Sequence, residues 1–402
     1  EKKKKIIDWV ADEGLHGRRT LAVATKELSA EEYDNAQDES SLSFIGCVSF
    51  VDPIKKSTIG AIQQAIDLNI SIKILTGDSK EVAGNVACEV GLAKNPNEAM
   101  LARDLFLLPY EEQMLALERI NVFARVSPEE KYKIISLLQK KYQVGFLGEG
   151  INDAPALKIA NVAIVVESAS DIAREAADII LLESSLDVVV GGIREGRQIF
   201  ANTIKYIRSS LSSNFGNFYA VAISSLFIPF LPMLPLQILL VNLLSDFPAI
   251  AIATDTVDQD ELREPQQYNI RKIIMFGTVL GIVSTVFDFI TFAYFSKIGE
   301  TALQTNWFIV SILTEILFLY SIRTRKLFFK TRAPSLPLMS LSIIAIIATV
   351  TIPFTSFGQS MFGFVAPTVH EMTVIGIIVL TYIITTEIVK LVYYRLSNNQ
   401  SA

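Results

Sequence analysis

The sequence has 402 residues, of which 50% are hydrophobic and 19% are charged, and its formal net charge is −6. An acidic balance argues against nucleic acid as a partner, because phosphate binding needs a basic surface, and only two cysteines exclude a disulfide scaffold. Of the 42 acidic and 36 basic residues, 31 and 23 precede residue 201. The second half is therefore too apolar for an ordinary soluble domain.

Residues 46–200 alternate short apolar strands with amphipathic helices. Such alternation predicts a parallel, doubly wound α/β sheet, whose ligands bind at the carboxyl ends of the strands. The predicted strands cover 44–51, 71–75, 121–126, 143–147 and 162–166, and the predicted helices cover 54–68, 80–91 and 128–141.

Two of these strands end in polar, glycine-rich segments. The sequence TGD at 76–78 follows one strand, GEGIND at 148–153 follows another, and Lys131 comes directly after FARVSPEE. A hydroxyl, a lysine and carboxylates at neighbouring strand ends suit a phosphoryl group with Mg²⁺. TGD alone could be a plain helix cap, whereas GEGIND followed by APAL is more specific.

Six apolar stretches in the second half predict transmembrane helices, each close to the ~20 residues that cross a bilayer. Lys and Arg gather in the gaps at 254–272 and 323–335, so the positive-inside rule predicts that residues 1–208 and the C-terminus are cytosolic. The alternative, two buried soluble hairpins, fits the number and length of these stretches poorly. The predicted spans are 209–228, 236–253, 273–295, 306–322, 336–352 and 370–391.

The first two predicted spans each carry oxygen-bearing side chains on one helical face. Pro248 follows the second set, and a proline in a span frees a backbone carbonyl. These side chains and the freed carbonyl together predict a binding site for a hard cation. Glu315 and Asp288 are further candidate ligands. The alternative is that the amides only hold the helices together. The two sets are Asn214 with Asn217, and Asn242 with Ser245 and Asp246.

Together these strings resemble the C-terminal half of a P-type ATPase. The matching motifs are KILTGD (73–78), FARVSPEEK (123–131), GEGINDAPAL (148–157) and DIAREAADIILLESSL (171–186). The magnesium-importing branch is the most similar, through FANTIKYIRSSLSSNFGNF (200–218), FLPMLPLQILLVNLLSD (230–246) and WFIVSILTEIL (307–317). Calcium pumps typically carry an acidic residue at the place of Asn217, so calcium and proton pumps stay as alternatives.

The resemblance implies three domains. Residues 1–45 would end a nucleotide-binding domain, 46–200 would form an incomplete haloacid-dehalogenase-like phosphorylation domain, and 201–402 would form a membrane domain of six helices. The implied function is ATP-driven cation transport across the plasma membrane, most simply magnesium import, through an aspartyl phosphate. ATP and Mg²⁺ are the implied cofactors, and the transported cation, the lipid bilayer and a missing N-terminal half are the implied partners.

The phosphorylated aspartate of the family lies in an Asp-Lys-Thr-Gly-Thr motif, which does not occur here. The chain is therefore expected to be inactive alone. Two readings of other classes stay open: a truncated, non-catalytic membrane protein, and a soluble-type phosphatase activity of residues 46–200, which the missing nucleophile disfavours.

The resemblance also implies roles for single residues. Glu149 stands where the family has an Mg²⁺-ligating aspartate, and its longer side chain predicts weaker Mg²⁺ binding, because Mg²⁺ demands near-ideal octahedral geometry. The remaining assignments are nucleotide and phosphoryl contacts for Arg19, Thr76, Gly77 and Asp78, phosphoryl contact for Lys131, phosphate and Mg²⁺ positioning for Asn152 and Asp153, and the transported cation for Asn214, Asn217, Asn242, Ser245, Asp246 and Glu315.

Overall fold

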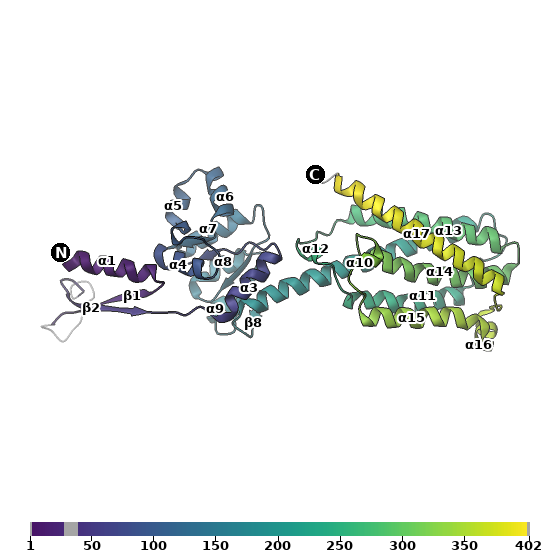
Figure 1. Ribbon diagram of the computed structural model, residues 1–402, viewed down its shortest axis with the longest axis horizontal. Coiled ribbons are helices and arrows are strands. Elements are labelled where there is room, and N and C mark those ends of the chain that lie inside the picture. Colours follow the sequence, from purple (N-terminus) through teal and green to yellow (C-terminus); the bar gives the residue numbers. More distant parts are fainter. Residues whose placement is uncertain (1, 28–38, 400–402) are drawn as a thin grey trace. The chain divides into compact units, whose positions relative to one another are not determined.

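The computed structural model describes residues 2–27 and 39–399 (Figure 1). The chain folds as two compact units, Glu1–Ile193 and Arg194–Ala402. Their division falls within one long helix, α10 (Leu186–Ser224). The predicted domain boundaries at 45/46 and 200/201 stay predictions, and residues 28–38 of the first predicted domain lie outside the described residues.

The first unit begins with helix α1 (Lys2–Leu15) and an antiparallel pair of strands, β1 (Arg19–Thr25) and β2 (Ser43–Phe50). Arg19 lies opposite Phe50, and Thr25 lies opposite Ser43. The predicted strand at 44–51 therefore exists, but its placement in a parallel sheet was wrong. No residue of β2 is buried, whereas the strands of a parallel sheet are normally covered on both faces.

The remaining strands form two separate three-stranded parallel sheets instead of one continuous doubly wound sheet. In the first, β5 (Val122–Ala124) lies between β3 (Ile74–Leu75) and β4 (Met100–Leu101). In the second, β7 (Val162–Val166) lies between β6 (Gly145–Gly148) and β8 (Ile179–Leu181). The parallel α/β class is thus confirmed, and the single sheet is not.

Short helices connect these strands and bury apolar side chains against them. The predicted helices at 54–68, 80–91 and 128–141 appear as α3 (Lys56–Asp67), α4 (Lys80–Glu89) and α7 (Pro128–Leu138). Ser127 and Glu130 form a capping box that fixes the start of α7. The others are α5 (Ala102–Leu107), α6 (Tyr110–Arg119), α8 (Ala154–Ile159) and α9 (Asp171–Glu175).

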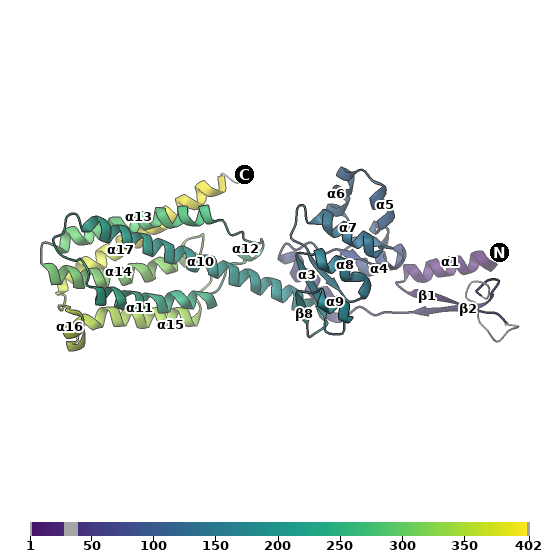
Figure 2. The same ribbon diagram turned by 180° about the vertical axis from the view of Figure 1, so that it is seen from behind.

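The second unit is a bundle of long helices joined by short ones (Figures 1 and 2). Helix α14 is central: 78% of its most apolar 18-residue stretch is buried, against 28% for α15 and for α17. The bundle contains part of α10, then α11 (Pro235–Ala251), α12 (Gln259–Leu262), α13 (Ile270–Phe295), α14 (Glu300–Ile322), α15 (Leu336–Thr351), α16 (Ser356–Phe362) and α17 (Val369–Asn399).

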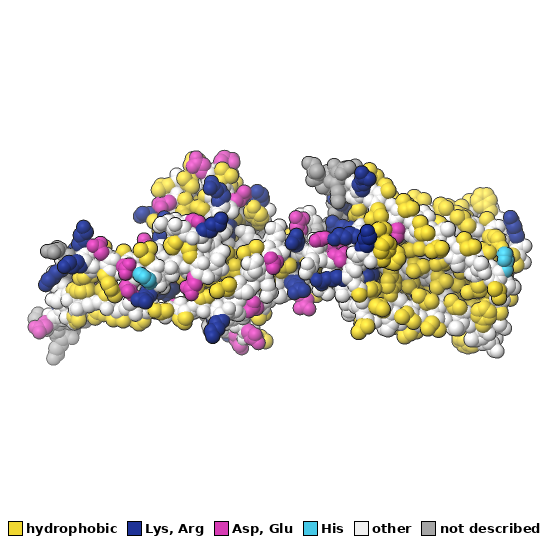
Figure 3. All heavy atoms as spheres, in the orientation of Figure 1, with side chains coloured by type: hydrophobic (Ala, Val, Ile, Leu, Met, Phe, Trp, Pro, Cys, Tyr) yellow, Lys and Arg dark blue, Asp and Glu magenta, His cyan; other side chains and the backbone are white. Residues whose placement is uncertain are grey.

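Among the described residues, five helices are long and apolar enough to cross a membrane. They match the second to sixth predicted spans. Large apolar side chains such as Leu239, Ile282, Ile347 and Ile384 are exposed on them, and hydrophobic atoms cover the visible face of this unit (Figure 3). An apolar exterior of this extent is what lipid contact requires, so this is a multi-pass membrane protein. The five segments are Pro235–Thr254, Ile270–Phe295, Glu300–Ile322, Leu336–Phe354 and Val369–Leu396.

The first predicted span, 209–228, is not among the five. Its residues 209–224 are helical, as the C-terminal part of α10, but the sequence SSLSSN at 209–214 lowers the hydropathy there. The prediction of six spans therefore stays a prediction.

Helices α10 and α13 approach closely at two glycines. A Cβ on Gly281 would lie 3.1 Å from the Cβ of Phe215 and 3.2 Å from the carbonyl oxygen of Ser212. A Cβ on Gly216 would lie 3.0 Å from the Cβ of Ser284. These contacts bring the polar face of α10 against α13, where an ordinary side chain would hold the helices apart.

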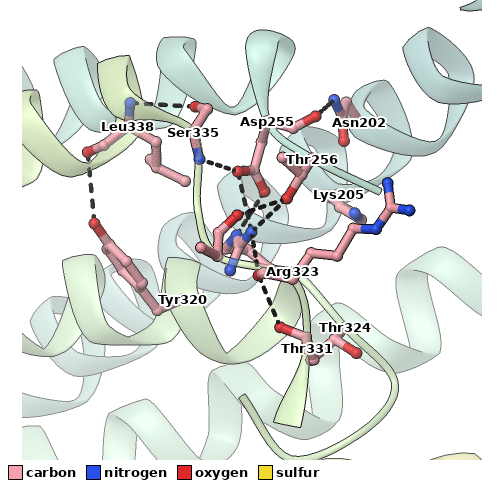
Figure 4. A network of polar contacts seen from close by, with 12 residues as sticks. Asn202, Lys205, Asp255, Thr256, Tyr320, Arg323, Thr324, Thr331, Ser335 and Leu338 are labelled. Carbon is pink, nitrogen blue, oxygen red and sulfur yellow. Dashed lines mark hydrogen bonds and ion pairs between the residues drawn. The ribbon is translucent and has the colours of Figure 1, made fainter. Parts of the chain in front are cut away.

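A buried polar network holds the loop that follows α11 (Figure 4). The side-chain amide of Asn202, on α10, donates to the backbone carbonyl of Asp255 at 2.8 Å. The carboxylate of Asp255 accepts from the Arg323 guanidinium and from the backbone amide of Ser335 at 2.9 Å. The network therefore ties α10, through the backbone of Asp255, and the segment after α14, through its carboxylate, to one buried residue.

Candidate functional site

The TGD segment follows β3 and is held by neighbouring backbone. The amide of Val126 donates to the carbonyl of Thr76, and that of Arg125 donates to the carbonyl of Asp78. The Thr76 hydroxyl donates to Asp78 Oδ2 at 3.0 Å. Thr76, Gly77 and Asp78 thus form a tight turn at the carboxyl end of a parallel strand, where ligands of α/β sheets bind.

Arg19 reaches this turn from β1. Its Nη2 donates to Asp78 Oδ2 at 2.7 Å. That hydrogen bond, together with the negative charge of Asp78, raises the pKa of Arg19 above its ordinary value. The structure therefore brings together two predicted residues that are 59 positions apart.

A second group lies around Asp153, after β6. Lys131 Nζ donates to Asp153 Oδ1 at 2.7 Å, and both side chains are mostly buried. Asp153 Oδ2 accepts from the backbone amides of Glu149 at 3.2 Å and Gly150 at 3.3 Å. Burial raises the pKa of Asp153, but the hydrogen bonds from Lys131 and these amides lower it further, so the net pKa is below its ordinary value.

The other two predicted residues of this loop, Glu149 and Asn152, are exposed. Gly148 is essential to the geometry, because a Cβ there would lie only 2.8 Å from the Cβ of Asp153. Asp78 and Asp153 follow strands of different sheets, and among the described residues no hydrogen bond or ion pair directly joins the Arg19–Asp78 pair to the Lys131–Asp153 pair.

In the helical unit, a cavity of about 260 Å³ lies among α10, α11 and α14. We call it the wide cavity. Its lining is rich in hydroxyl, amide and carboxylate oxygens, which are the ligands that hard cations prefer. Five of the predicted residues line it together: Asn214, Asn242, Ser245, Asp246 and Glu315.

Pro248 does not break α11. The helix continues to Ala251 and then tightens into a 3₁₀ turn at Ile252–Thr254. Pro248 has no amide proton, so it cannot donate to the carbonyl of Leu244 four residues earlier. The carbonyl of Leu244 therefore lacks its usual helical donor, although the helix is unbroken.

Asn217 lies elsewhere. It lines a smaller cavity of about 20 Å³, which we call the narrow chamber, together with Asp288 of α13 and Tyr382 of α17. Ser213 and Glu315 line both cavities, and the Ser213 hydroxyl donates to Glu315 Oε1 at 2.6 Å. The predicted cation residues thus divide between two adjoining cavities that share one carboxylate.

Sequence reasoning missed Ser213, and the signal that could have found it is the serine run just before Asn214. It also missed Trp307, whose indole Nε1 donates to Asp288 Oδ1 at 2.8 Å. Among the described residues, no three His, Cys, Asp or Glu side chains gather into a metal-binding group. A cation in the wide cavity would therefore rely on amide and hydroxyl oxygens beside its two carboxylates.

Comparison with known proteins gives a consistent result. Residues 230–392 match the family described as "Cation transporting ATPase, C-terminus". The chain is 40% identical to the "Magnesium-transporting ATPase, P-type 1" of Escherichia coli K12 and 39% identical to that of Salmonella typhimurium. Each alignment is 401 positions long and covers 98% of this chain. It covers 44% of each of these relatives.

A calcium-transporting ATPase of Bacillus cereus is more distant, at 31% identity over 349 residues, which is 80% of this chain and 39% of that protein. The chain spans less than half the length of each of these relatives. The resemblance noted from the motifs is confirmed: residues 230–392 match the C-terminal domain family of cation-transporting ATPases, and the chain as a whole resembles the C-terminal half of a magnesium-transporting P-type ATPase.

Proposed function

We propose that this chain is the C-terminal half of a P-type ATPase that imports magnesium at the expense of ATP. The wide cavity is the observation that carries the proposal. It places Asn214, Asn242 and Asp246 around one space inside the apolar bundle. Such polar groups are costly in hydrocarbon and mark ion pathways. A space of about 260 Å³ also leaves room for the water molecules that Mg²⁺ gives up reluctantly.

In this proposal α10 supplies the first of six spans. Its residues 209–214 are mostly polar because most of them line the wide cavity or the narrow chamber. The basic residues in the loops at 254–272 and 323–335 support a cytosolic position for those loops and for residues 1–208. The C-terminus, after an even number of spans, would then be cytosolic too, in a plasma-membrane protein.

Residues 46–200 would form most of a haloacid-dehalogenase-like phosphorylation domain, and residues 1–45 would end a nucleotide-binding domain. Two separate parallel sheets, with β3 and β6 each at a sheet edge, leave unpaired backbone that a further strand could join. We place the strand that carries the phosphorylated aspartate between them, supplied by the N-terminal half. That strand would bring the TGD turn and the Asp153 loop around one aspartate.

The residues at these strand ends fit a phosphoryl group, ATP and Mg²⁺. Arg19 and Thr76 offer donors to phosphate oxygens, and Lys131 offers a positive charge to the group in transfer. Asp153, with Glu149 beside it, would hold Mg²⁺, which neutralises charge on the phosphoryl oxygens when bound. Asn152 is exposed and free to orient the phosphate.

Transport would follow from the continuity of α10. The helix begins at Leu186, in the first unit, and residues between Tyr206 and Asn214 on it line the wide cavity. A rearrangement of the phosphorylation domain would therefore pull directly on a helix that lines the cation site. Opening the site alternately to the two sides of the membrane requires such a moving element.

The test is Asp246→Asn in the complete pump. We expect Mg²⁺ transport to be abolished while ATP still phosphorylates the enzyme, because Asp246 lines the wide cavity and not the strand ends. Asp260→Asn is the matched control, since Asp260 is exposed on α12 and lines neither cavity, and it should transport normally. Loss of phosphorylation as well as transport in Asp246→Asn would contradict a role confined to the cation site.

Two further measurements separate the rival functions. A polypeptide mass near 44.5 kDa in the native membrane, detected with a C-terminal antibody, would favour a truncated, non-catalytic protein, whereas about twice that mass is expected here. Phosphoenzyme formed with Ca²⁺ but not Mg²⁺ as the transported ion would favour a calcium pump. Phosphatase activity of residues 46–200 alone is not expected, because they lack the nucleophile.

A further inference from the structure

The narrow chamber contains two buried polar atoms with no hydrogen-bond partner among the described residues. Asp288 is 5% exposed; its Oδ1 accepts from Trp307, but its Oδ2 has no partner. Ser212 is 2% exposed, and its Oγ also has no partner. Buried polar atoms are nearly always satisfied, so two of them lining one cavity point to a ligand within it.

The geometry points to a binding site for one monovalent cation, stripped of its water, in the narrow chamber, where it competes with the cation of the wide cavity. The competition with a cation in the wide cavity rests on the proposed function, whereas the binding of the monovalent cation in the narrow chamber does not. Asp288 Oδ2 and Ser212 Oγ would be two of its ligands. Neutral oxygens from Asn217, Ser284 and Tyr382 line the same space.

Charge favours a cation over a water molecule. Asp288 and Glu315 both line the chamber, and no Lys or Arg among the described residues does so. A carboxylate taken out of water is strongly destabilised unless an opposite charge compensates it. A water molecule could satisfy the hydrogen bonds of Asp288 and Ser212, but only a cation would compensate the charge of an ionised Asp288.

Size selects the kind of cation. The space of about 20 Å³ is just above the roughly 10–15 Å³ that one water molecule needs. A hydrated Mg²⁺ is much larger, and Mg²⁺ gives up its waters reluctantly. A potassium ion has nearly the size of one water molecule and is far easier to dehydrate. The narrow chamber therefore fits a bare monovalent ion, whereas the wide cavity fits a hydrated divalent one.

Glu315 couples the two cavities. Its carboxylate lines both, and Ser213, which lines both as well, donates to its Oε1. A cation in the narrow chamber would attract the charge of Glu315 and so weaken its attraction for a cation in the wide cavity. The two cations should therefore bind antagonistically, and the antagonism should be reciprocal.

The first experiment measures binding without any enzymatic activity. The complete protein, purified in detergent without Mg²⁺, is unfolded by heat in potassium chloride and, at equal ionic strength, in N-methylglucamine chloride, whose cation is too large for the chamber. We expect potassium to raise the midpoint of unfolding of the parent. Asp288→Asn, which keeps an oxygen for Trp307, should lose this rise, and Ser212→Ala should reduce it.

Asp246→Asn is the matched control, because it changes the wide cavity alone, and it should keep the potassium effect. Equal midpoints in the two salts for the parent would overturn the inference and leave a water molecule as the occupant. An undiminished potassium effect in both Asp288→Asn and Ser212→Ala would also overturn it, because the ion would then bind elsewhere.

The second experiment tests the antagonism. Potassium at a concentration equal to its dissociation constant should raise the Mg²⁺ concentration for half-maximal ATPase activity about twofold in the parent, and should not do so in Asp288→Asn. An equal Mg²⁺ requirement in both salts for the parent would refute the antagonism. If the protein has no Mg²⁺-dependent ATPase activity, the proposed function fails. The potassium-dependent unfolding midpoint still shows whether the narrow chamber binds a monovalent cation.

Discussion

Arg323 and Asp255 form a buried, two-point ion pair between segments 68 positions apart in the sequence. Arg323 Nε donates to Asp255 Oδ2 at 2.5 Å, and Nη2 donates to Oδ1 at 3.1 Å. The Asp255 side chain is 0% exposed and that of Arg323 is 4% exposed. The pair therefore fixes the loop after α11 against the segment after α14, at one end of the bundle that contains the wide cavity.

Replacing one member of this pair should destabilise the protein strongly. In Asp255→Ala the guanidinium would stay buried without its counter-charge, a change that costs about 3–5 kcal/mol. The measurement is the shift in unfolding midpoint of the complete protein in detergent. The control is Asp260→Ala, which removes an exposed pair with Lys326 and should shift the midpoint very little, because exposed ion pairs contribute little to stability. Equal shifts in the two variants would refute this account.

Gly148→Ala should impair phosphorylation by displacing Asp153. An added Cβ would lie 2.8 Å from the Cβ of Asp153, closer than such atoms approach, so the loop and its hydrogen bond to Lys131 must shift. A misplacement of catalytic groups by about 1 Å can cost on the order of 100-fold in rate. The measurement is the initial rate of phosphoenzyme formation from ATP.

Gly150→Ala is the control for that substitution, because its added Cβ would meet nothing closer than 3.9 Å. It should keep a rate close to that of the parent. A loss of similar size in both variants would mean that the loop tolerates no side chain at all, and that the position of Asp153 is not the cause.

The sequence was sufficient to place most helices, because their periodicity and length are local properties. Predicted spans 236–253 and 273–295 correspond to α11 (Pro235–Ala251) and α13 (Ile270–Phe295). The pairing of Arg323 with Asp255 could not be predicted, since basic residues between spans indicate topology and not partners. The distribution of charges in a sequence therefore predicts the membrane topology but not which charged residues form buried ion pairs.

The cation residues show the same limit. Asn214 and Asn217 lie three apart on α10, and local spacing alone suggests one shared site. The structure separates them because α13 packs against α10 through Gly216 and Gly281 and brings Asp288 beside Asn217. That division is a property of helix packing. The split into two parallel sheets was equally hidden, because strand periodicity does not reveal which strand is a neighbour.

Lys131→Gln should destabilise the protein in a pH-dependent manner. The hydrogen bond from Lys131 is one cause of the low pKa of Asp153, so its stabilising effect is present above the ordinary carboxyl pKa of about 3.9. It is lost as the pH falls through the lower pKa of the folded state. We expect a loss of roughly 1.5–3 kcal/mol at pH 7, shrinking below pH about 4, measured by unfolding with a chelator present.

Lys133→Gln provides the matched control for Lys131→Gln. Lys133 lies on the same helix, α7, but pairs with Glu129 at the surface, where both side chains are exposed. Exposed pairs at this spacing contribute little to stability, so the control should unfold nearly as the parent does. A destabilisation by Lys131→Gln that did not change with pH would show that packing of the lysine stem, and not its charge, is responsible.

Glu149→Asp should strengthen Mg²⁺ binding at the phosphorylation site. Glu149 is exposed, so shortening it disturbs no packing, and the change withdraws the carboxylate by about one C–C bond, ~1.5 Å. Because Mg²⁺ requires near-ideal octahedral geometry, the Mg²⁺ concentration for half-maximal phosphorylation by ATP should fall, on the order of tenfold. Glu111→Asp, exposed on α6, should leave it unchanged. An unchanged requirement in Glu149→Asp would mean that this carboxylate does not ligate Mg²⁺ and that Asp153 holds the ion without it.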